Sequence, residues 1–310
     1  MPFAAHAQQA IPVVGYLNAQ SAGDRPFLLD AFRRGLAEGG YVEGRNVAIE
    51  YRYADNRIEK IRAQAAELVS RQVAAIVATG GNNSALVAKT LTSVIPILFT
   101  SGVDPVTAGL VASLGRPEAN VTGVAWFSSE LPPKHIELLR EVLPRASVFG
   151  LFLNPISPEA VTAEATARQA AGASGVRLVL VRARTVDEID AAFDTLVREQ
   201  VDAAVVGADP FYTGRAKQFA LLAARHRIPF AYTNREFVEA GGLMAYGNNV
   251  TDAYHRVGLL TARILKGAKP ADLPIERAVK FELAVSLTAA KVLGLTLPHS
   301  LLSRADEVLD

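Results

Sequence analysis

Residues 73–84 read VAAIVATGGNNS, and this stretch carries the pattern that predicts the fold. The apolar run at 73–78 has the length of one buried strand. Gly80 and Gly81 follow it, and a helical pattern begins at Ser84. A buried strand that runs through a glycine-containing turn into a helix is the repeating unit of parallel sheets.

The same unit repeats on both sides of this stretch. Strand patterns are found at residues 11–17, 46–53, 95–99 and 122–125, and helical patterns at 27–39, 58–71 and 84–92. Strands that alternate with helices in this way predict an α/β fold in which helices cover both faces of a parallel sheet.

The pattern restarts in the second half of the chain. Helices are predicted at 134–142, 158–171, 186–199 and 214–226, and strands at 147–153, 176–181, 202–206, 228–232 and 243–246. Thr185 and Glu188 have the spacing of a capping box, and Asn234 is expected to cap a short helix that ends at Gly241. Pro96 and Pro229 each open an apolar strand, where proline sacrifices no central ladder bond. The two halves are therefore predicted to be two domains of one architecture.

The pattern changes after Gly247. A long helix is predicted at 248–266, a strand at 280–287 and short helices at 288–292 and 301–302. We expect this tail to return to the first domain, so that the chain crosses between domains several times and allows hinge bending about a cleft. The predicted lobes are residues 11–123 plus 247–276, and residues 124–246 plus 277–310.

Composition excludes several classes of protein. The chain has 310 residues, which suggests about two domains. Its 32 Lys+Arg and 31 Asp+Glu give a formal net charge of +1, which argues against a dedicated nucleic-acid binder. There is no cysteine, so disulfides, thiolate zinc sites and a cysteine nucleophile are excluded. No apolar run approaches the length of a transmembrane helix.

The N-terminus has the pattern of a processed export signal. Ala5-His6-Ala7 fits the small-x-small sequence before a signal-peptidase cut, with Gln8 as the first mature residue. A disordered tail is the alternative. Residues 1–10 are therefore interpreted as a signal-peptide remnant or a disordered segment, and they are left out of the fold prediction.

Candidate binding residues are those that follow the predicted strands, because ligands of open parallel sheets bind beyond the carboxyl ends of the strands. These positions are rich in small polar side chains. The candidates are Gln20, Ser21, Gly81, Asn82, Asn83, Ser84, Thr100, Ser101, Asp104, Asn154, Asp209, Phe211, Tyr232, Asn234 and Arg235.

Each of the stronger candidates has a plain structural alternative. A carboxylate is expected to bind near Asn82 at a helix N-terminus, or else Asn or Ser there simply caps the helix. Asp209 is suited to pairing with a ligand ammonium, or it forms an Asx-Pro turn. Arg235 is suited to binding a carboxylate, or it pairs with Glu239 four residues on.

No motif points to an enzyme. The five histidines form no HExxH pair, and there is no GxSxG, GxGxxG or GxxxxGK[ST] sequence. His135, His226 and His255 fall in predicted helices away from the strand ends. We therefore predict no catalytic residue, no metal and no cofactor.

The chain resembles the solute-binding proteins of bacterial ABC transporters, in the branch related to tryptophan and aromatic amino-acid importers. The resemblance runs from residue 4 to residue 307. Its phrases include FRRGL at 32–36, DPV at 104–106, GLVASL at 109–114, NVTG at 120–123, REFVEAGGLM at 235–244, AYG at 245–247 and KFEL at 280–283.

This resemblance implies a type I periplasmic-binding-protein fold, with two doubly wound parallel-sheet lobes joined by a hinge that the chain crosses several times. It implies an exported, periplasmic receptor that binds a small ligand between its lobes by domain closure and delivers it to an ABC permease of the inner membrane. The implied ligand is an amino acid, aromatic or not, or a related carboxylate, and the implied state is a monomer without nucleic acid. Asp209-Pro210-Phe211 departs from the Asp-Asn pattern of the tryptophan branch.

The sequence is also compatible with two other classes of protein. One is a two-lobed cytosolic α/β enzyme of the racemase or isomerase type without cysteine chemistry. The other is a ligand-sensing regulatory domain, although no helix-turn-helix pattern precedes the first strand. Thermal unfolding against a metabolite library would distinguish a receptor from an enzyme, because a receptor leaves its ligand unchanged.

Overall fold

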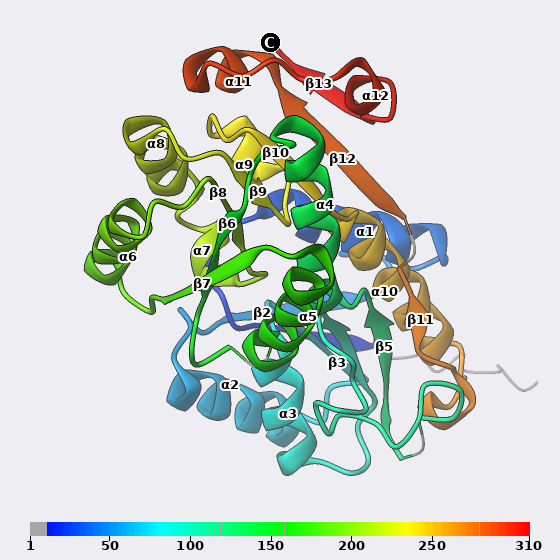
Figure 1. Ribbon diagram of the computed structural model, residues 1–310. Coiled ribbons are helices and arrows are strands. Elements are labelled where there is room, and N and C mark those ends of the chain that lie inside the picture. Colours follow the sequence, from blue (N-terminus) through cyan, green and yellow to red (C-terminus); the bar gives the residue numbers. More distant parts are fainter. Residues whose placement is uncertain (1–10, 118, 158, 279) are drawn as a thin grey trace, which may run out of the picture. The chain divides into compact units, whose positions relative to one another are not determined.

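The computed structural model describes residues 11–117, 119–157, 159–278 and 280–310 (Figure 1). The chain divides into two compact units. Unit 1 contains the chain up to Ser101, Pro105–Ala125 and Val250–Arg277. Unit 2 contains Gly102–Asp104, Trp126–Asn249 and Ala278–Asp310. The proposed signal-peptide remnant at 1–10 lies outside the described residues.

Unit 1 is built on a six-stranded sheet in the order β11-β5-β4-β3-β1-β2, and every neighbouring pair is parallel. Its strands are β1 (Val13–Asn18), β2 (Ala48–Tyr53), β3 (Ala75–Thr79), β4 (Ile97–Ser101), β5 (Val121–Ala125) and β11 (Glu276–Arg277). Its helices are α1 (Pro26–Glu38), α2 (Ile58–Ser70), α3 (Asn82–Leu91), α10 (Val250–Leu265) and the 3₁₀ turn η2 (Pro270–Asp272). Helix α1 packs on α10, and α2 packs on α3.

Unit 2 is built on a seven-stranded sheet in the order β13-β12-β10-β9-β8-β6-β7. Its strands are β6 (Val148–Leu153), β7 (Arg177–Arg182), β8 (Ala203–Val206), β9 (Phe230–Tyr232), β10 (Met244–Asn248), β12 (Phe281–Ser286) and β13 (Glu307–Leu309). Its helices are η1 (Ser128–Glu130), α4 (Pro132–Val142), α5 (Glu159–Ser174), α6 (Val186–Arg198), α7 (Pro210–Thr213), α8 (Ala216–His226), α9 (Glu236–Glu239), α11 (Leu287–Leu293) and α12 (His299–Leu302). Strand β12 runs antiparallel to β10, because the chain enters it from unit 1 rather than through a crossover helix.

The two sheets share one plan, as the sequence predicted. In chain order, the first five strands of each unit lie in the order 2-1-3-4-5, which is one of the two common doubly wound arrangements. The carbonyl oxygens of Pro96 and Pro229 accept equivalent bonds from the neighbouring strand, at 2.8 and 2.9 Å. Gly15 and Gly150 also occupy equivalent places, since a Cβ on either would approach a leucine of the helix that follows the second strand of its unit to 2.8 Å.

The core of unit 2 has two layers, one on each face of its sheet. Successive residues of a strand point to opposite faces, so Leu151 and Phe152 belong to different apolar clusters. The cluster under α6 and α8 is strongly aromatic. Phe152 lies 5.2 Å from both Phe193 and Phe219, measured between ring centroids. Both faces are buried, as the continuous apolar strand patterns predicted.

Helix α10 returns to unit 1 and packs unusually close to α1. A Cβ on Gly35 would collide with the His255 carbonyl oxygen, and a Cβ on Gly258 would collide with the Phe32 carbonyl oxygen. One turn further along each helix, a Cβ on Gly39 would collide with the Cβ of Ala262. Small residues at these crossings therefore let the two backbones approach each other directly.

Two local predictions, both of helix caps, have clear outcomes. The Thr185 cap is confirmed, because its hydroxyl accepts the Glu188 N–H at 3.3 Å. The Asn234 cap is wrong: helix α9 has Arg235 as its N-cap residue, and the Asn234 amide donates to the Thr213 hydroxyl at 2.9 Å instead. The short strands β11 and β13 were not predicted, because two or three residues are too few to show a period.

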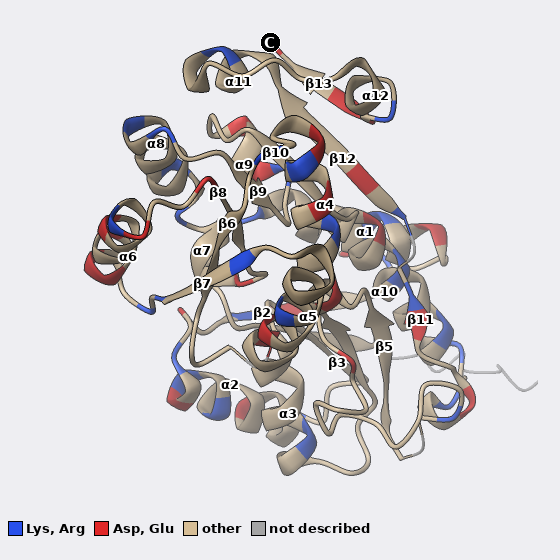
Figure 2. Ribbon diagram, in the orientation of Figure 1, with Lys and Arg blue, Asp and Glu red and all other residues tan. Residues whose placement is uncertain are grey.

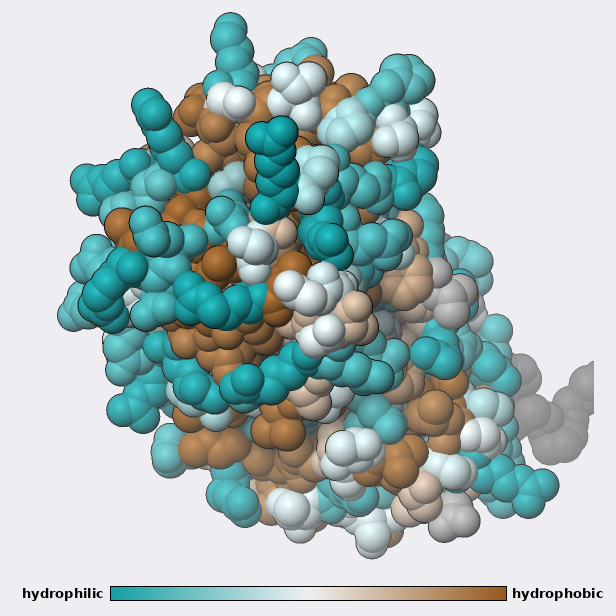
Figure 3. All heavy atoms as spheres, in the orientation of Figure 1, coloured by the Kyte–Doolittle hydropathy of each residue, from teal (hydrophilic) through white to brown (hydrophobic). Residues whose placement is uncertain are grey.

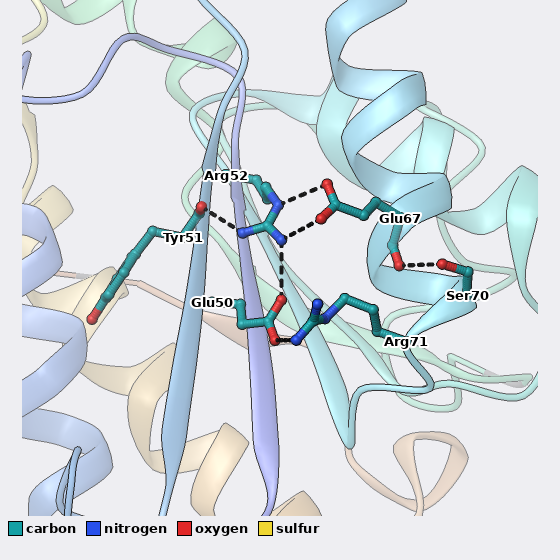
Figure 4. A network of polar contacts seen from close by, with 6 residues as sticks. All are labelled: Glu50, Tyr51, Arg52, Glu67, Ser70 and Arg71. Atoms are coloured by element: carbon teal, nitrogen blue, oxygen red, sulfur yellow. Dashed lines mark hydrogen bonds and ion pairs between the residues drawn. The ribbon is translucent and has the colours of Figure 1, made fainter.

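The edge strand β2 carries charge rather than an open apolar face. Arg52 donates to Glu67 at 2.7 Å and to Glu50 at 3.1 Å, and Arg71 pairs with Glu50 at 2.6 Å (Figure 4). Charged side chains on an edge strand oppose pairing with another chain. Acidic and basic residues are interspersed on the helices as well (Figure 2).

On the face shown in Figure 3, hydrophilic side chains surround the exposed apolar ones. Within the described residues, none of the helices combines the length and the apolar character needed to cross a bilayer.

Candidate functional site

The candidate residues of unit 1 come together where adjacent strands end. Strands β1, β3 and β4 are neighbours in the sheet, and Asn18 is in register with Thr79. The loops that follow these strands are joined by their backbones, since the Ala19 N–H donates to the Thr79 carbonyl oxygen at 3.1 Å. Gln20, Thr100 and Ser101 are buried at this edge of the sheet.

The glycine turn, residues 79–84, connects β3 to α3. Gly80 and Gly81 have φ values of +78° and +126°, in a region that side-chain-bearing residues rarely adopt. A Cβ on Gly80 would also collide with the Asn18 side-chain oxygen. The Ser84 hydroxyl donates to the Thr79 carbonyl oxygen at 2.9 Å and closes the turn.

Asn82 is the first residue of α3 and is only 4% exposed. Its amide nitrogen and its amide oxygen are both buried without a hydrogen-bond partner. The N-cap residue is Gly81, and no side chain caps the helix, so neither Asn82 nor Ser84 serves as the cap that was the alternative interpretation. A buried amide without partners costs about 1–3 kcal/mol, which a bound polar group would recover.

The loop after β1 lines a small polar cavity of about 20 Å³, room for a single water. Tyr16, Gln20, Ser21 and Tyr53 contribute to its wall. The pKa of Tyr16 is raised well above its usual value by burial and, after that, by the neighbouring Tyr254. Tyr16 is therefore a neutral hydroxyl at this edge of the sheet.

The candidate residues of unit 2 form a second polar cluster, again at the ends of adjacent strands. Asn154 follows β6 and donates its amide to Asp209 Oδ2 at 3.1 Å. Asp209 Oδ1 accepts the backbone N–H groups of Phe211 and Tyr212, at 2.9 and 3.2 Å. Asp209 thus caps α7, as its Asx-Pro sequence suggested, and its second oxygen is held by Asn154.

Glu159 belongs to the same cluster and was not among the predicted residues. It is the first residue of α5, and the Ser157 hydroxyl donates to its Oε2 at 2.5 Å. Burial raises the pKa of Glu159, and the charge of Asp209 raises it further. Burial also raises the pKa of Asp209, against the effect of the Asn154 hydrogen bond. Two carboxyl groups in one buried cluster favour a cation as their counterpart.

Glu159 lies where the sequence pattern is weak. The polar residues directly after β6 are Asn154 and Ser157, and Glu159 has the pattern of an ordinary acidic residue in the first turn of a helix. A Cβ on Gly102 would lie 3.5 Å from Glu159 Oε1 and 3.2 Å from Trp126 Nε1. The closeness of Gly102 to this carboxylate is a long-range contact that no local motif reveals.

The remaining predicted residues have other surroundings. Tyr232 is fully buried between Phe230 and Phe237, with ring centroids 5.8 and 4.4 Å away. Arg235 pairs with Glu239 at 2.8 Å, as the alternative interpretation had it, and with Glu307 at 2.9 Å.

Asp104, Phe211 and Asn83 complete the candidate set. Asp104 is partly buried in unit 2. The Phe211 ring is partly buried beneath the Arg215 guanidinium, 4.3 Å from the ring centroid. Asn83 is exposed, beside the buried Asn82. The ligand-binding role of the whole set stays a prediction.

Comparison with known proteins identifies the family. The family of ABC transporter substrate binding proteins matches residues 26–309. This chain belongs to that family. A tyrosine-binding protein of Clostridioides difficile strain R20291 is 26% identical over 264 residues, which cover 85% of this chain and 75% of the relative. Members of the family bind small ligands, work with ABC transporters and are exported or extracytoplasmic.

Solved structures share the fold of this chain. A conserved domain protein of Vibrio cholerae is 26% identical with a TM-score of 0.89, covering 96% of this chain and 99% of that one. An ABC domain of Streptococcus pneumonia, solved in complex with L-Trp, is 24% identical with a TM-score of 0.87 and the same coverage. The predicted type I periplasmic-binding-protein fold is confirmed.

Proposed function

We propose that this substrate-binding protein is the periplasmic receptor of an ABC importer and that its ligand is an α-amino acid with an aromatic side chain. The observation that carries the proposal is the buried, unpartnered amide of Asn82 at the start of α3. The choice of an aromatic amino acid is supported by the similarity to the clostridial tyrosine-binding protein.

The glycine turn is suited to the ligand carboxylate. The N-terminus of α3 carries a partial positive charge, and its first N–H groups have no partner within the helix. The Asn82 amide nitrogen is a further donor that no protein group occupies. An anion at this place would satisfy backbone and side-chain donors together.

The acidic cluster of unit 2 is suited to the ligand ammonium. Asp209 and Glu159 supply carboxylates whose burial disfavours their charged forms. An ammonium group offsets that cost by direct pairing. A zwitterionic amino acid therefore matches the two polar clusters, one charge to each.

Ligand-driven closure is part of the proposal. The chain passes between units several times, which suits a hinge made of several connecting segments; the passages follow Ser101, Asp104, Ala125, Asn249 and Arg277. A ligand held by groups from both units would favour the closed state by its differential affinity. We also propose delivery to an inner-membrane permease, and a monomeric receptor.

Isothermal titration calorimetry tests the assignment with L-tyrosine, tyramine and 3-(4-hydroxyphenyl)propionate. Tyramine lacks the carboxylate and the propionate lacks the ammonium, so both should bind the wild-type protein more weakly than L-tyrosine. Asn82→Ala should weaken L-tyrosine binding about 10- to 100-fold, the effect of losing a hydrogen bond to a charged group. Its affinity for tyramine should be unchanged.

The variant Gln169→Ala is the control, because Gln169 is exposed on α5 and lies outside the predicted binding set. It should keep wild-type affinity for all three compounds. Asp209→Asn should weaken L-tyrosine but not the propionate. Equal affinities of the wild type and Asn82→Ala for L-tyrosine would contradict the carboxylate assignment, and consumption of any compound would indicate an enzyme.

A further inference from the structure

Tyr254 connects a distant helix to the glycine turn. It lies in α10, and its hydroxyl accepts the Gly80 N–H at 3.3 Å, across 174 residues of sequence. Tyr254 is 2% exposed, so water does not compete freely for this hydroxyl. The bond uses the first backbone donor after β3.

The glycine turn depends on such contacts for its shape. Gly80 has a positive φ, and glycine residues have many accessible conformations. On one side the turn is held by Ala19, whose N–H donates to the Thr79 carbonyl oxygen. On another side the Ser84 hydroxyl donates to the same oxygen. The Thr79 carbonyl and the Gly80 N–H belong to the same peptide group, and Tyr254 holds the N–H side of that group.

Helix α10 is a rigid support for this hydroxyl. Gly258, one turn after Tyr254, packs directly on the α1 backbone, where a Cβ would collide with the Phe32 carbonyl oxygen. Val257 and Tyr254 are both buried, so the start of α10 is fixed on the sheet as well as on α1. The ring of Tyr254 therefore has a defined place from which to reach the turn.

We propose that Tyr254 is a positioning residue for ligand binding: its hydroxyl holds the Gly80 peptide so that the Asn82 amide is already oriented before the ligand arrives. Tyr254 need not touch the ligand. Without its hydroxyl, the turn samples more conformations, and ligand binding must order it again. The expected effect on ligand affinity rests on the proposed function. The effect of Tyr254 on the turn rests on the structure of unit 1 alone.

The test is Tyr254→Phe, which removes one oxygen and keeps the buried ring. In the ligand-free protein, the Gly80 amide should shift in a ¹⁵N-correlated NMR spectrum and exchange its proton faster. The affinity for L-tyrosine should fall about three- to tenfold, the range expected for one neutral hydrogen bond. The unfolding midpoint in urea should stay close to that of the wild type.

Tyr41→Phe is the control, because Tyr41 follows α1 and lies outside the turn. It should change neither the Gly80 amide nor the affinity. An unchanged Gly80 amide in Tyr254→Phe overturns the inference, and so does a disturbed amide with unchanged affinity. A wild-type protein that binds no amino acid refutes the proposed function, and with it the ligand-binding consequence; the amide measurement then still reports whether Tyr254 orders the turn.

Discussion

Two buried polar side chains, Asn82 and His135, differ in how their hydrogen-bonding atoms are used. Asn82 leaves both amide atoms without a partner at the carboxyl edge of its sheet. His135 lies on α4, fully buried, with Nε2 2.6 Å from the Tyr246 carbonyl oxygen of β10 and only Nδ1 without a partner. The first arrangement suits a ligand, whereas the second fixes a helix to a strand. Burial alone therefore does not identify a binding residue.

His135 should make stability depend on pH. Burial lowers its pKa to about 4, below the value of about 6.5 in an unfolded chain. The unfolded state therefore binds the proton more readily, and the stability of the folded state falls as pH drops from about 6.5 to about 4. The loss should approach about 3 kcal/mol, at 1.4 kcal/mol for each unit of pKa difference.

Urea unfolding of the wild type and His135→Gln between pH 4 and 7 measures this effect. The glutamine amide can still donate to Tyr246, so the variant should fold but lack this part of the pH slope. The raised pKa values of Asp209 and Glu159 change the free energy of unfolding with pH in the opposite direction to His135. Because this contribution is the same in both proteins, it cancels in the comparison. Parallel curves for the two proteins would show that His135 titrates normally.

At the scale of elements, the contact between α1 and α10 decides where the chain goes after it leaves unit 2. Gly35 and Gly258 remove the side chains that would otherwise keep the helix axes apart. The close approach lets α10 lie against strands β3, β4 and β5 while it packs on α1. In this position it brings Tyr254 to the glycine turn.

Gly35→Ala should therefore be strongly destabilising. The added Cβ would collide with the His255 carbonyl oxygen, which is backbone and cannot rotate away. Overpacking at such a place costs about 3 kcal/mol or more, measured as the free energy of unfolding in urea.

Gly172→Ala is the matched control for this substitution. Gly172 lies inside α5 with open space around its Cβ position, so alanine there should stabilise by about 0.5 kcal/mol. Similar free energies of unfolding for the two variants would mean that α1 and α10 can separate without cost.

At the scale of the whole molecule, two units of the same strand order each present a polar cluster at the carboxyl ends of their strands. Trp126, the only tryptophan, begins unit 2 after the crossover from β5. Its indole nitrogen lies near Gly102, and Gly102 lies near Glu159. A ligand that binds at the acidic cluster should therefore change the surroundings of this ring.

Trp126 fluorescence should report binding. Excitation at a wavelength that tyrosine does not absorb should give a saturable change in emission as L-tyrosine is added, with the dissociation constant found by calorimetry. Asp209→Asn should shift the titration to higher ligand concentration, and Gln169→Ala should leave it unchanged. If calorimetry detects binding but the emission does not change, the ligand does not bind near Trp126.

Apart from the short strands β11 and β13, the order of the strands, the duplicated plan and the strand ends that carry polar residues could be predicted from the sequence. They depend on periodicity and on glycine and proline signals within about ten residues, which the chain carries locally. The pattern also offered, as alternatives to ligand binding, a turn at Asp209 and a pair of Arg235 with Glu239, because both interactions span four residues or fewer.

Tertiary structure alone decided which of these residues meet. Asn154 reaches Asp209 across 55 residues, and Tyr254 reaches Gly80 across 174. Tyr232 was expected near the ligand, yet its ring is stacked in the core, because a strand's side chains alternate between faces and the local sequence does not say which face is free. Such contacts depend on how distant segments pack, and packing is a property of the whole unit rather than of any stretch within it.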